Sequence, residues 1–463
     1  MSRLQKPALA AVLARGPAIA LALGLLLILG LGSASFSGVF TQKRLPTRAV
    51  FRPAREARSD RDVRLSRQRF APDRVLVKLR GSVPAGTEEA FLGSYQLRAV
   101  RRIPGVDVFK AQTPAGMTVA QTLAVLRANP DIAYASPDYR TRIALAPNDP
   151  FYVPYQYNLN NRGLVLNISA TIHPQTTAHA DIKAAAAWEE TQGNADVVIA
   201  VLDTGVDMSH VELVNKVVSA GRDFVNGDDD ATDDNWHGTH VAGVAAAETN
   251  NGEGIAGVAW NCKVLPVKVM DQDGNGFYST LIEGLTWAAD NGAKVINLSV
   301  GGDVDDPALK DACRYAYDKN VVIVAAAGND APAVVFPAAY DQYVLAVAST
   351  DYNDEWSAFS TTGPEVDVAA PGVYILGPVP QWFAGPGYEP YLFATGTSMA
   401  TPHVAGMAAL ILSAKPWLKP QDVMAIIRYT ADDVNKAQHP GRDDYIGYGR
   451  VNMERALVPY VLK

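Results

Sequence analysis

The 463-residue sequence lacks the signals of several large protein classes. It contains only two cysteines, Cys262 and Cys313, which permit at most one disulfide and match no CxxC spacing for zinc or redox chemistry. No HExxH motif is present, which argues against a zinc protease. Charged residues make up 19% of the chain and hydrophobic residues 48%, so a wholly disordered or coiled-coil protein is excluded.

Positive charge is scarce in most of the chain. Residues 1–80 carry 16 Lys and Arg against 4 Asp and Glu, which leaves 25 basic and 44 acidic residues in 81–463. Nucleic-acid binding needs clustered Lys and Arg on the folded surface. The acidic balance therefore argues against nucleic acid as a partner.

The N-terminal apolar run is shorter than a membrane-spanning helix. Pro17–Leu31 has 15 residues, whereas a spanning helix needs ~20. Arg3, Lys6 and Arg15 precede the run and small residues follow it, so residues 1–35 are predicted to be a secretory signal peptide. We expect a secreted, extracellular protein. A periplasmic location and a membrane anchor through an uncleaved segment are the alternatives.

Two folded regions are predicted after a linker. Residues 36–70 carry ten Lys or Arg against three acidic residues and almost no apolar periodicity, which predicts a basic disordered linker. Residues 71–142 predict a small α+β unit, with strands at 74–79 and 131–136 and a helix at 119–126. A longer region, 148–463, follows.

The longer region alternates apolar runs with helical patterns. The runs, which read as strands buried on both faces, end at Asp203, Asp271, Gly302, Asn329 and Thr350. The helical patterns cover 237–248, 278–290 and 307–319. This alternation predicts an α/β fold with a doubly wound, mostly parallel sheet flanked by helices, whose ligands bind at the carboxyl ends of the strands.

Three residues at such positions match the needs of acyl transfer. A serine hydroxyl needs a histidine to take its proton, and the imidazole needs a carboxylate to fix its tautomer. Asp203, His237 and Ser398 fill these roles, although each alone has a structural interpretation as a strand end, a packed histidine or a helix cap. Ser398 is expected at the start of a helix over 404–412, where the dipole favours negative charge. Asn329 offers a second oxyanion donor beside the Ser398 N–H.

The motifs DTGVD, HGTHVAG, AAAGN and GTSMATPHVAG resemble those of the subtilisin-like serine proteases, or subtilases, over residues 148–455. LAVASTD and VDVAAPG are most similar to the thermitase-like branch. The resemblance implies Asp203 as orienting acid, His237 as general base, Ser398 as nucleophile and Asn329 as oxyanion residue. It also implies polypeptide substrates, and we expect a monomer.

Further site residues are implied by this resemblance. A peptide substrate would pair with the edge of the site as an added antiparallel strand, and its side chains would enter apolar pockets of broad specificity. The residues concerned are Ser299, Val300, Gly301, Gly274, Gly276, Tyr278, Ala326 and Gly328. Asp330 is an alternative determinant that would attract a basic residue before the scissile bond. Phe336-Pro337 matches a point where the family commonly has a cis-proline turn.

Calcium is the predicted metal. Carboxylates crowd the segment 223–234, and they need either solvent or a hard cation to offset their repulsion. The resemblance implies one structural Ca²⁺ site at Asp223, Asp228 and Asp230, and a second at Asp149, Glu212 and Asn251 in the loop 250–254. A solvated acidic loop is the alternative to the first site.

In this family, a small domain such as 71–142 has a ferredoxin-like fold and acts as an intramolecular chaperone and inhibitor. The resemblance therefore predicts a zymogen that cleaves itself between Tyr139 and Asn148. A large parallel sheet has mostly non-local contacts and folds slowly, so a template helps it.

Three features depart from the family pattern. Trp236 stands where the family typically has glycine, and 160–181 reads as an insertion. The segment 373–393 is longer than the usual connection and is predicted to be a lid or a surface loop.

Two other functions are weighed. An α/β-hydrolase esterase is suggested by the partial GxSxG match at Ser398, but that fold needs Asp and His after the serine, and only His403 and His439 follow. A catalytically inactive homologue that binds peptides is the second alternative.

Overall fold

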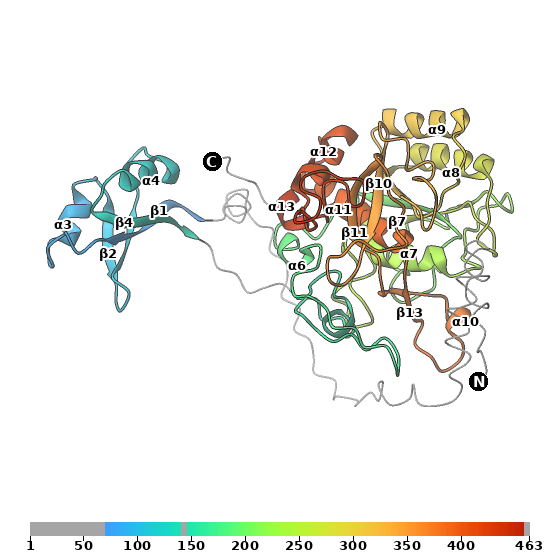
Figure 1. Cartoon of the computed structure of the whole chain (residues 1–463), viewed down its shortest axis with the longest axis horizontal. Coiled ribbons are helices and arrows are strands. Elements are labelled where there is room, and N and C mark those ends of the chain that lie inside the picture. The colour runs from blue at the N-terminus through green and yellow to red at the C-terminus, as the bar shows by residue number, and fades with distance from the viewer. Residues whose placement is uncertain (1–69, 140–145, 458–463) are drawn as a thin grey trace, which may run out of the picture. The chain divides into compact units, whose positions relative to one another are not determined.

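The computed structural model describes residues 70–139 and 146–457, which form two compact units (Figure 1). The predicted signal peptide and nearly all of the predicted linker lie outside these residues. Most of the predicted cleavage segment, 140–145, also lies outside them. No helix in the described ranges is long and apolar enough to cross a membrane.

The N-terminal unit has the predicted ferredoxin-like topology. Its elements are β1 (Phe70–Leu79), α3 (Glu88–Gly93), β2 (Arg98–Ile103), β3 (Val108–Gln112), α4 (Val119–Arg127) and β4 (Ile132–Tyr139). The strands form an antiparallel sheet in the order β2-β3-β1-β4. Thr118 and Gln121 form a capping box that starts α4, and Leu126 of α4 packs in a core with Val75 and Phe109. The strand and helix patterns expected in this unit are confirmed.

The C-terminal unit is built on a seven-stranded parallel sheet. Its strands are β5 (Val198–Asp203), β6 (Arg222–Asp223), β7 (Lys263–Lys268), β8 (Ala293–Leu298), β9 (Val322–Ala326), β10 (Val344–Thr350) and β11 (Val366–Pro371). Their order is β11-β10-β9-β8-β5-β7-β6, and all pairs are parallel. The order runs outward on both sides of β5 and β8, which confirms the predicted doubly wound sheet.

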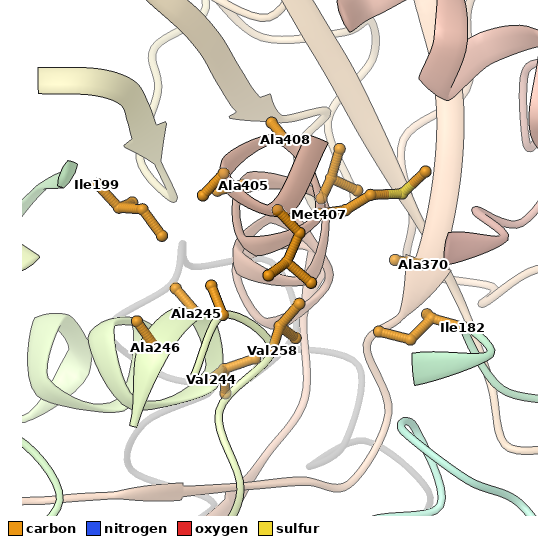
Figure 2. Packing of buried hydrophobic residues seen from close by; sticks show 14 of the residues in the cluster. Ile182, Ile199, Val244, Ala245, Ala246, Val258, Ala370, Ala405, Met407 and Ala408 are labelled. Carbon is orange, nitrogen blue, oxygen red and sulfur yellow. The ribbon is translucent and has the colours of Figure 1, made fainter. Parts of the chain in front are cut away.

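Helices cover both faces of this sheet, so its central strands are buried on both sides. One face carries α8 (Tyr278–Asp290) and α9 (Pro307–Asp318), which lie together in Figure 1. The other carries α7 (His237–Ala246) and α11 (Thr397–Ala414), which meet through small side chains including Ala245 and Ala405 (Figure 2). A Cβ on Gly406 would lie 2.6 Å from Val258, so glycine permits this close approach.

The predicted helix over 404–412 is longer in the structure, because α11 begins at Thr397 and contains Pro402. Pro402 has no N–H to bond the Ser398 carbonyl one turn earlier. That carbonyl instead accepts a hydrogen bond from Ser299 Oγ at 2.8 Å, so a residue from the end of β8 compensates for the proline.

The segment 373–393 is mostly ordered secondary structure. β12 (Ile375–Pro378) and β13 (Tyr391–Ala394) pair as an antiparallel hairpin, with the short helix α10 (Gln381–Ala384) between them. We call residues 375–394 the active-site hairpin. The remaining short or C-terminal helices are α5 (Tyr152–Tyr155), α6 (Ala184–Ala187), α12 (Pro420–Thr430) and α13 (Met453–Leu457).

Three smaller expectations have clear outcomes. The Phe336-Pro337 bond is cis. Cys262 and Cys313 are both buried free thiols, so the one disulfide that the sequence permits does not form. Burial raises the pKa of Cys313 to about 12, which keeps it protonated. Residues 160–181, which we expect to be an insertion, are mostly irregular, with a bridge between Val165 and Gln175.

Candidate active site

The four predicted catalytic residues lie at the carboxyl ends of parallel strands or at the helix starts that follow them. Asp203 is the last residue of β5, and His237 is the first residue of α7. Asn329 follows β9, and Ser398 is the second residue of α11. The crossover topology brings these chain positions to one edge of the sheet.

Asp203 and His237 form a direct hydrogen bond. His237 Nδ1 lies 2.7 Å from Asp203 Oδ1, which also accepts from the Thr204 N–H at 2.8 Å. A Cβ on Gly238 would lie 2.1 Å from the Gly205 carbonyl oxygen, so this glycine allows the first turn of α7 to approach β5. Burial disfavours the imidazolium, but the charge and hydrogen bond of Asp203 outweigh it and raise the pKa of His237.

A second carboxylate, Asp233, supports the first turn of α7. It is 2% exposed and accepts hydrogen bonds from Thr204 Oγ1 at 2.8 Å, the Trp236 N–H at 3.0 Å and the Thr239 N–H at 2.9 Å. It therefore joins the end of β5 to a helix start whose N–H groups need acceptors. Sequence reasoning placed Asp233 in the acidic calcium segment. Its position ahead of a helix start was the signal for a cap.

Ser398 is half-buried and faces the end of β8. Its hydroxyl donates to the Ser299 carbonyl at 2.9 Å, while Ser299 Oγ donates to the Ser398 carbonyl. Within the described residues, no hydrogen bond joins Ser398 Oγ to His237. Catalytic hydrogen bonds of this kind often tighten only when substrate is bound.

Asn329 is held by its amide oxygen. Oδ1 accepts from the Thr397 N–H at 2.9 Å and from Thr397 Oγ1 at 3.0 Å, which ties it to the residue before Ser398. The side chain is exposed, and its Nδ2 group remains as a donor. The amide is thus oriented beside the start of α11.

The predicted substrate-binding residues lie on three neighbouring segments. Ser299, Val300 and Gly301 directly follow β8, and a Cβ on Gly301 would lie 2.7 Å from Val335. Gly274 and Gly276 are exposed in the loop before α8. Tyr278 begins α8 and donates its hydroxyl to the Val304 carbonyl at 2.9 Å.

The remaining predicted wall residues lie at the end of β9 and just after it. Ala326 is its last residue and is 4% exposed, and Gly328 has φ of 110°, where glycine is favoured. Asp330, the alternative specificity residue, is exposed. Its N–H donates to the Phe359 carbonyl at 2.7 Å.

Asp149 and Glu212 converge on one loop. The Asp149 carboxylate accepts from the Asn250 and Asn251 N–H groups, and Glu212 Oε1 accepts from the Ile255 N–H at 2.7 Å and from the Tyr391 hydroxyl at 2.9 Å. Glu212 Oε2 is buried without a partner among the described residues. Burial raises the pKa of Glu212 to about 8, and nearby Asp149 adds to the shift. A buried carboxylate oxygen without a partner, near the second carboxylate Asp149, is chemically suited to a hard cation such as calcium.

Asp223, Asp228 and Asp230 bond mainly within their own loop. Asp223 Oδ1 accepts from the Val225 and Asn226 N–H groups, and Asp228 accepts from the Asp230 N–H at 3.0 Å. Asp223 is buried, whereas Asp228 and Asp230 are exposed. In the described ranges, no cluster of three or more His, Cys, Asp or Glu has the geometry of a metal site.

The histidines after the catalytic segments are structural. His403 lies in the buried part of α11, with Nε2 2.7 Å from Asn158 Nδ2 and Nδ1 2.8 Å from the Met399 carbonyl. Burial lowers the pKa of His403 to about 4. Its ring is engaged on both nitrogens, so it does not serve as the base that the esterase alternative requires.

Comparison with known proteins agrees with this geometry. The model of the subtilase family matches residues 194–449, and that of the fervidolysin N-terminal prodomain matches 57–138. A thermophilic serine proteinase from Bacillus sp. (strain AK1) is 39% identical over 84% of this chain and 88% of its own. Thermitase from Thermoactinomyces vulgaris is 42% identical over 67% of this chain and 99% of its own.

Solved structures give the same result. A protease from Pseudoalteromonas arctica superposes with a TM-score of 0.57 and 31% identity, covering 68% of this chain and 99% of that one. The resemblance in the sequence motifs and the doubly wound sheet are both confirmed, and the α/β-hydrolase alternative is wrong. The chain is a member of the subtilase family, a subtilisin-like serine protease with a fervidolysin-like prodomain.

Proposed function

We propose that this chain is a secreted serine endopeptidase whose peptide hydrolysis is carried out by Asp203, His237 and Ser398. The buried hydrogen bond of 2.7 Å between Asp203 and His237 supports this assignment most directly. It holds Nδ1 protonated and leaves Nε2 as the base that takes the Ser398 proton. Ser398 then attacks the scissile carbonyl, and His237 delivers the proton to the leaving amine.

The second half-reaction regenerates the enzyme. Water takes the place of the leaving amine, loses a proton to His237 and attacks the acyl-enzyme. In both steps, negative charge develops on the carbonyl oxygen of the substrate. The Ser398 N–H and Asn329 Nδ2 are the donors we assign to that oxygen, since the Asn329 amide is already oriented by Thr397.

Substrate affinity is assigned to the backbone of the strand ends around the site. Residues 299–301 and 274–276 offer edges to an added peptide strand, and residues 326–328 form the wall for the side chain before the scissile bond. The buried alanines in this wall favour apolar side chains.

The N-terminal regions supply export and control. We assign residues 1–35 to a signal peptide, and the ferredoxin-like unit to an intramolecular chaperone and inhibitor that is removed by self-cleavage between Tyr139 and Asn148.

Subtilases generally bind structural calcium. We assign one ion to Asp149, Glu212 and the loop containing Asn251, where it would neutralise buried carboxylates and hold the loop. A second assignment, at Asp223, Asp228 and Asp230, rests on the resemblance alone.

The decisive experiment compares the secreted protein with its Ser398→Ala variant. Intact mass and N-terminal sequence report processing, and a fluorophosphonate probe reports an activated serine. We expect the wild type to lose its prodomain and to take up one probe, while the variant stays full length and unlabelled. A Ser413→Ala variant is the matched control, because Ser413 lies near the far end of α11 and bonds the Ala409 carbonyl.

Two outcomes contradict the assignment. If the wild type is folded but takes up no probe after its prodomain is cut by an added protease, the chain is an inactive peptide-binding homologue. If Ser398→Ala is processed and labelled like the wild type, another residue is the nucleophile.

A further inference from the structure

Three aromatic side chains form a row that starts at the catalytic histidine. The Trp236 ring lies edge-on to His237, with centroids 5.7 Å apart, and stacks on Phe383 at 5.5 Å with an interplanar angle of 29°. Phe383 in turn meets Trp382 edge-on at 5.9 Å. We call Trp236, Phe383 and Trp382 the aromatic ledge. Its outer member, Trp382, is 59% exposed.

Trp236 occupies its position at a structural cost. Its φ is 117°, in the left-handed region where a side chain is strained, and its indole Nε1 is buried without a partner among the described residues. Glycine at this position would have neither the backbone strain nor an unpaired N–H group. The Trp236 side chain is, however, buried, with 9% exposure, and packs against His240 and Phe383. This packing offsets the strain and fixes the inner end of the ledge beside His237.

The active-site hairpin holds the outer members in place. Gln381 Nε2 donates to the Gly385 carbonyl at 2.9 Å, and the Val379 N–H donates to the Pro390 carbonyl at 2.8 Å. The buried His240 ring lies 3.1 Å from the carbonyls of Ile375 and Leu392, so α7 is bonded to both strands of the hairpin. The exposed Trp382 is thus held on an internally bonded loop, and the rings of Phe383 and Trp236 connect it to His237.

The ledge comes from elements other than those assigned to the acyl side of the site, which is the part that binds substrate residues before the scissile bond. The assigned edges and wall for the acyl side follow β8, β9 and β7, whereas the ledge combines the residue before α7 with the hairpin that leads into Ser398. His237 must lie close to the leaving amine in order to protonate it. A side chain attached just beyond that amine is therefore close to the ring that begins the ledge.

We propose that the aromatic ledge binds a substrate side chain on the leaving-group side of the scissile bond and selects large apolar or aromatic residues there. This inference rests on the proposed function. Trp382 and the exposed part of Phe383 contact the substrate side chain, and Trp236 is a positioning residue that holds Phe383.

Partitioning of the acyl-enzyme tests this side of the site alone. Enzyme produced from the full-length chain is acylated with one peptide ester, and phenylalaninamide or glycinamide then competes with water for the same acyl group. The ratio of aminolysis to hydrolysis measures how well each amine binds at the leaving-group side of the site, from which it attacks the acyl-enzyme. One aromatic contact predicts roughly a tenfold preference for phenylalaninamide over glycinamide in the wild type.

Variants of the ledge should reduce this preference. We expect Trp382→Ala and Phe383→Ala to lower it to about threefold or less, and Trp382→Phe to retain most of it. Trp236→Gly should lower it as well, because it removes the ring that holds Phe383. Trp417→Ala is the matched control, because Trp417 is 71% exposed and follows the far end of α11.

The outcomes separate the two proposals. If the ester acylates Ser398 but the preference is flat in the wild type, or is unchanged in both Trp382→Ala and Phe383→Ala, the ledge does not bind substrate and the proposed function stands. If no acyl-enzyme forms on a folded, processed protein, the proposed function fails and the ledge inference fails with it.

Discussion

Replacing Asp203 with asparagine tests the centre of the proposed site. The substitution preserves the shape of the side chain but removes the buried charge that lies 2.7 Å from His237 Nδ1. An amide also allows the imidazole to adopt the wrong tautomer, with its proton on Nε2. For this kind of triad the expected loss in kcat is about 10⁴-fold, or about 5 kcal/mol of transition-state stabilisation.

The same variant should move the pH profile. Burial lowers the pKa of His237, whereas the charge and hydrogen bond of Asp203 raise it above 6.5 in the wild type. Without Asp203, the effect of burial dominates and the pKa falls. Since the base acts in its neutral form, activity rises with pH through this pKa. The acid limb of kcat/KM therefore lies above pH 6.5 in the wild type and shifts to lower pH in Asp203→Asn.

The free energy of unfolding should change with pH in the opposite direction to activity in the wild type. Because the folded-state pKa of His237 is raised, its contribution to the free energy of unfolding is fully present below the unfolded-state pKa and is lost as pH rises through the folded-state pKa. In Asp203→Asn the folded-state pKa lies below the unfolded-state value, so the sign reverses and the contribution of His237 to the free energy of unfolding is lost as pH falls.

The assay is kcat/KM against pH with an uncharged peptide ester. Asp196→Asn is the control, because Asp196 is exposed just before β5 and its loss gives the same change in net charge. The reasoning is refuted if the acid limb of Asp203→Asn stays in place or moves upward, or if the loss in kcat is less than tenfold.

Two further predictions follow. Asn329→Ala should lower kcat by about 10²–10³-fold with little change in KM, since the charge that Asn329 meets develops only in the transition state; a change confined to KM in steady-state kinetics would contradict the oxyanion role. Chelation of calcium should lower the melting temperature, because an ion at 100 times its Kd contributes about 2.7 kcal/mol. Glu212→Gln should already melt lower and respond less to the chelator, and an equal response in both proteins would remove Glu212 from the site.

The sheet and the positions of the proposed catalytic residues were accessible from the sequence for a physical reason. A parallel strand buried on both faces requires an almost continuous apolar run, and the five runs expected are β5, β7, β8, β9 and β10. The polar residues that end such runs meet at one edge, which is why Asp203 and Asn329 could be assigned to one site. β6 and the four-residue strands β12 and β13 are too short to give such a pattern.

The parts that sequence reasoning missed depend on contacts between distant segments. The helix expected over 404–412 begins at Thr397 in the structure, and Ser299 supplies a hydrogen bond to the Ser398 carbonyl that Pro402 leaves free. Asp233 looked like one of several acidic residues in a calcium loop, and its contacts with Thr204 and Thr239 identify it as a support of α7. Ser299 and Thr204 are both distant in the sequence from the residues that they bond.

The contacts around His237 explain how this residue can be held rigidly while the substrate specificity beside it varies. His237 is fixed from three sides: by Asp203, by the Asp233 bonds to the first turn of α7, and by Gly238 against Gly205. None of these contacts involves the active-site hairpin. The hairpin is instead bonded one turn along α7, at His240, and its Phe383 stacks on the Trp236 ring that lies against His237. Substitutions in the ledge can therefore change what binds beside His237 without moving its hydrogen bond to Asp203, because the hairpin and the supports of His237 are separate sets of contacts.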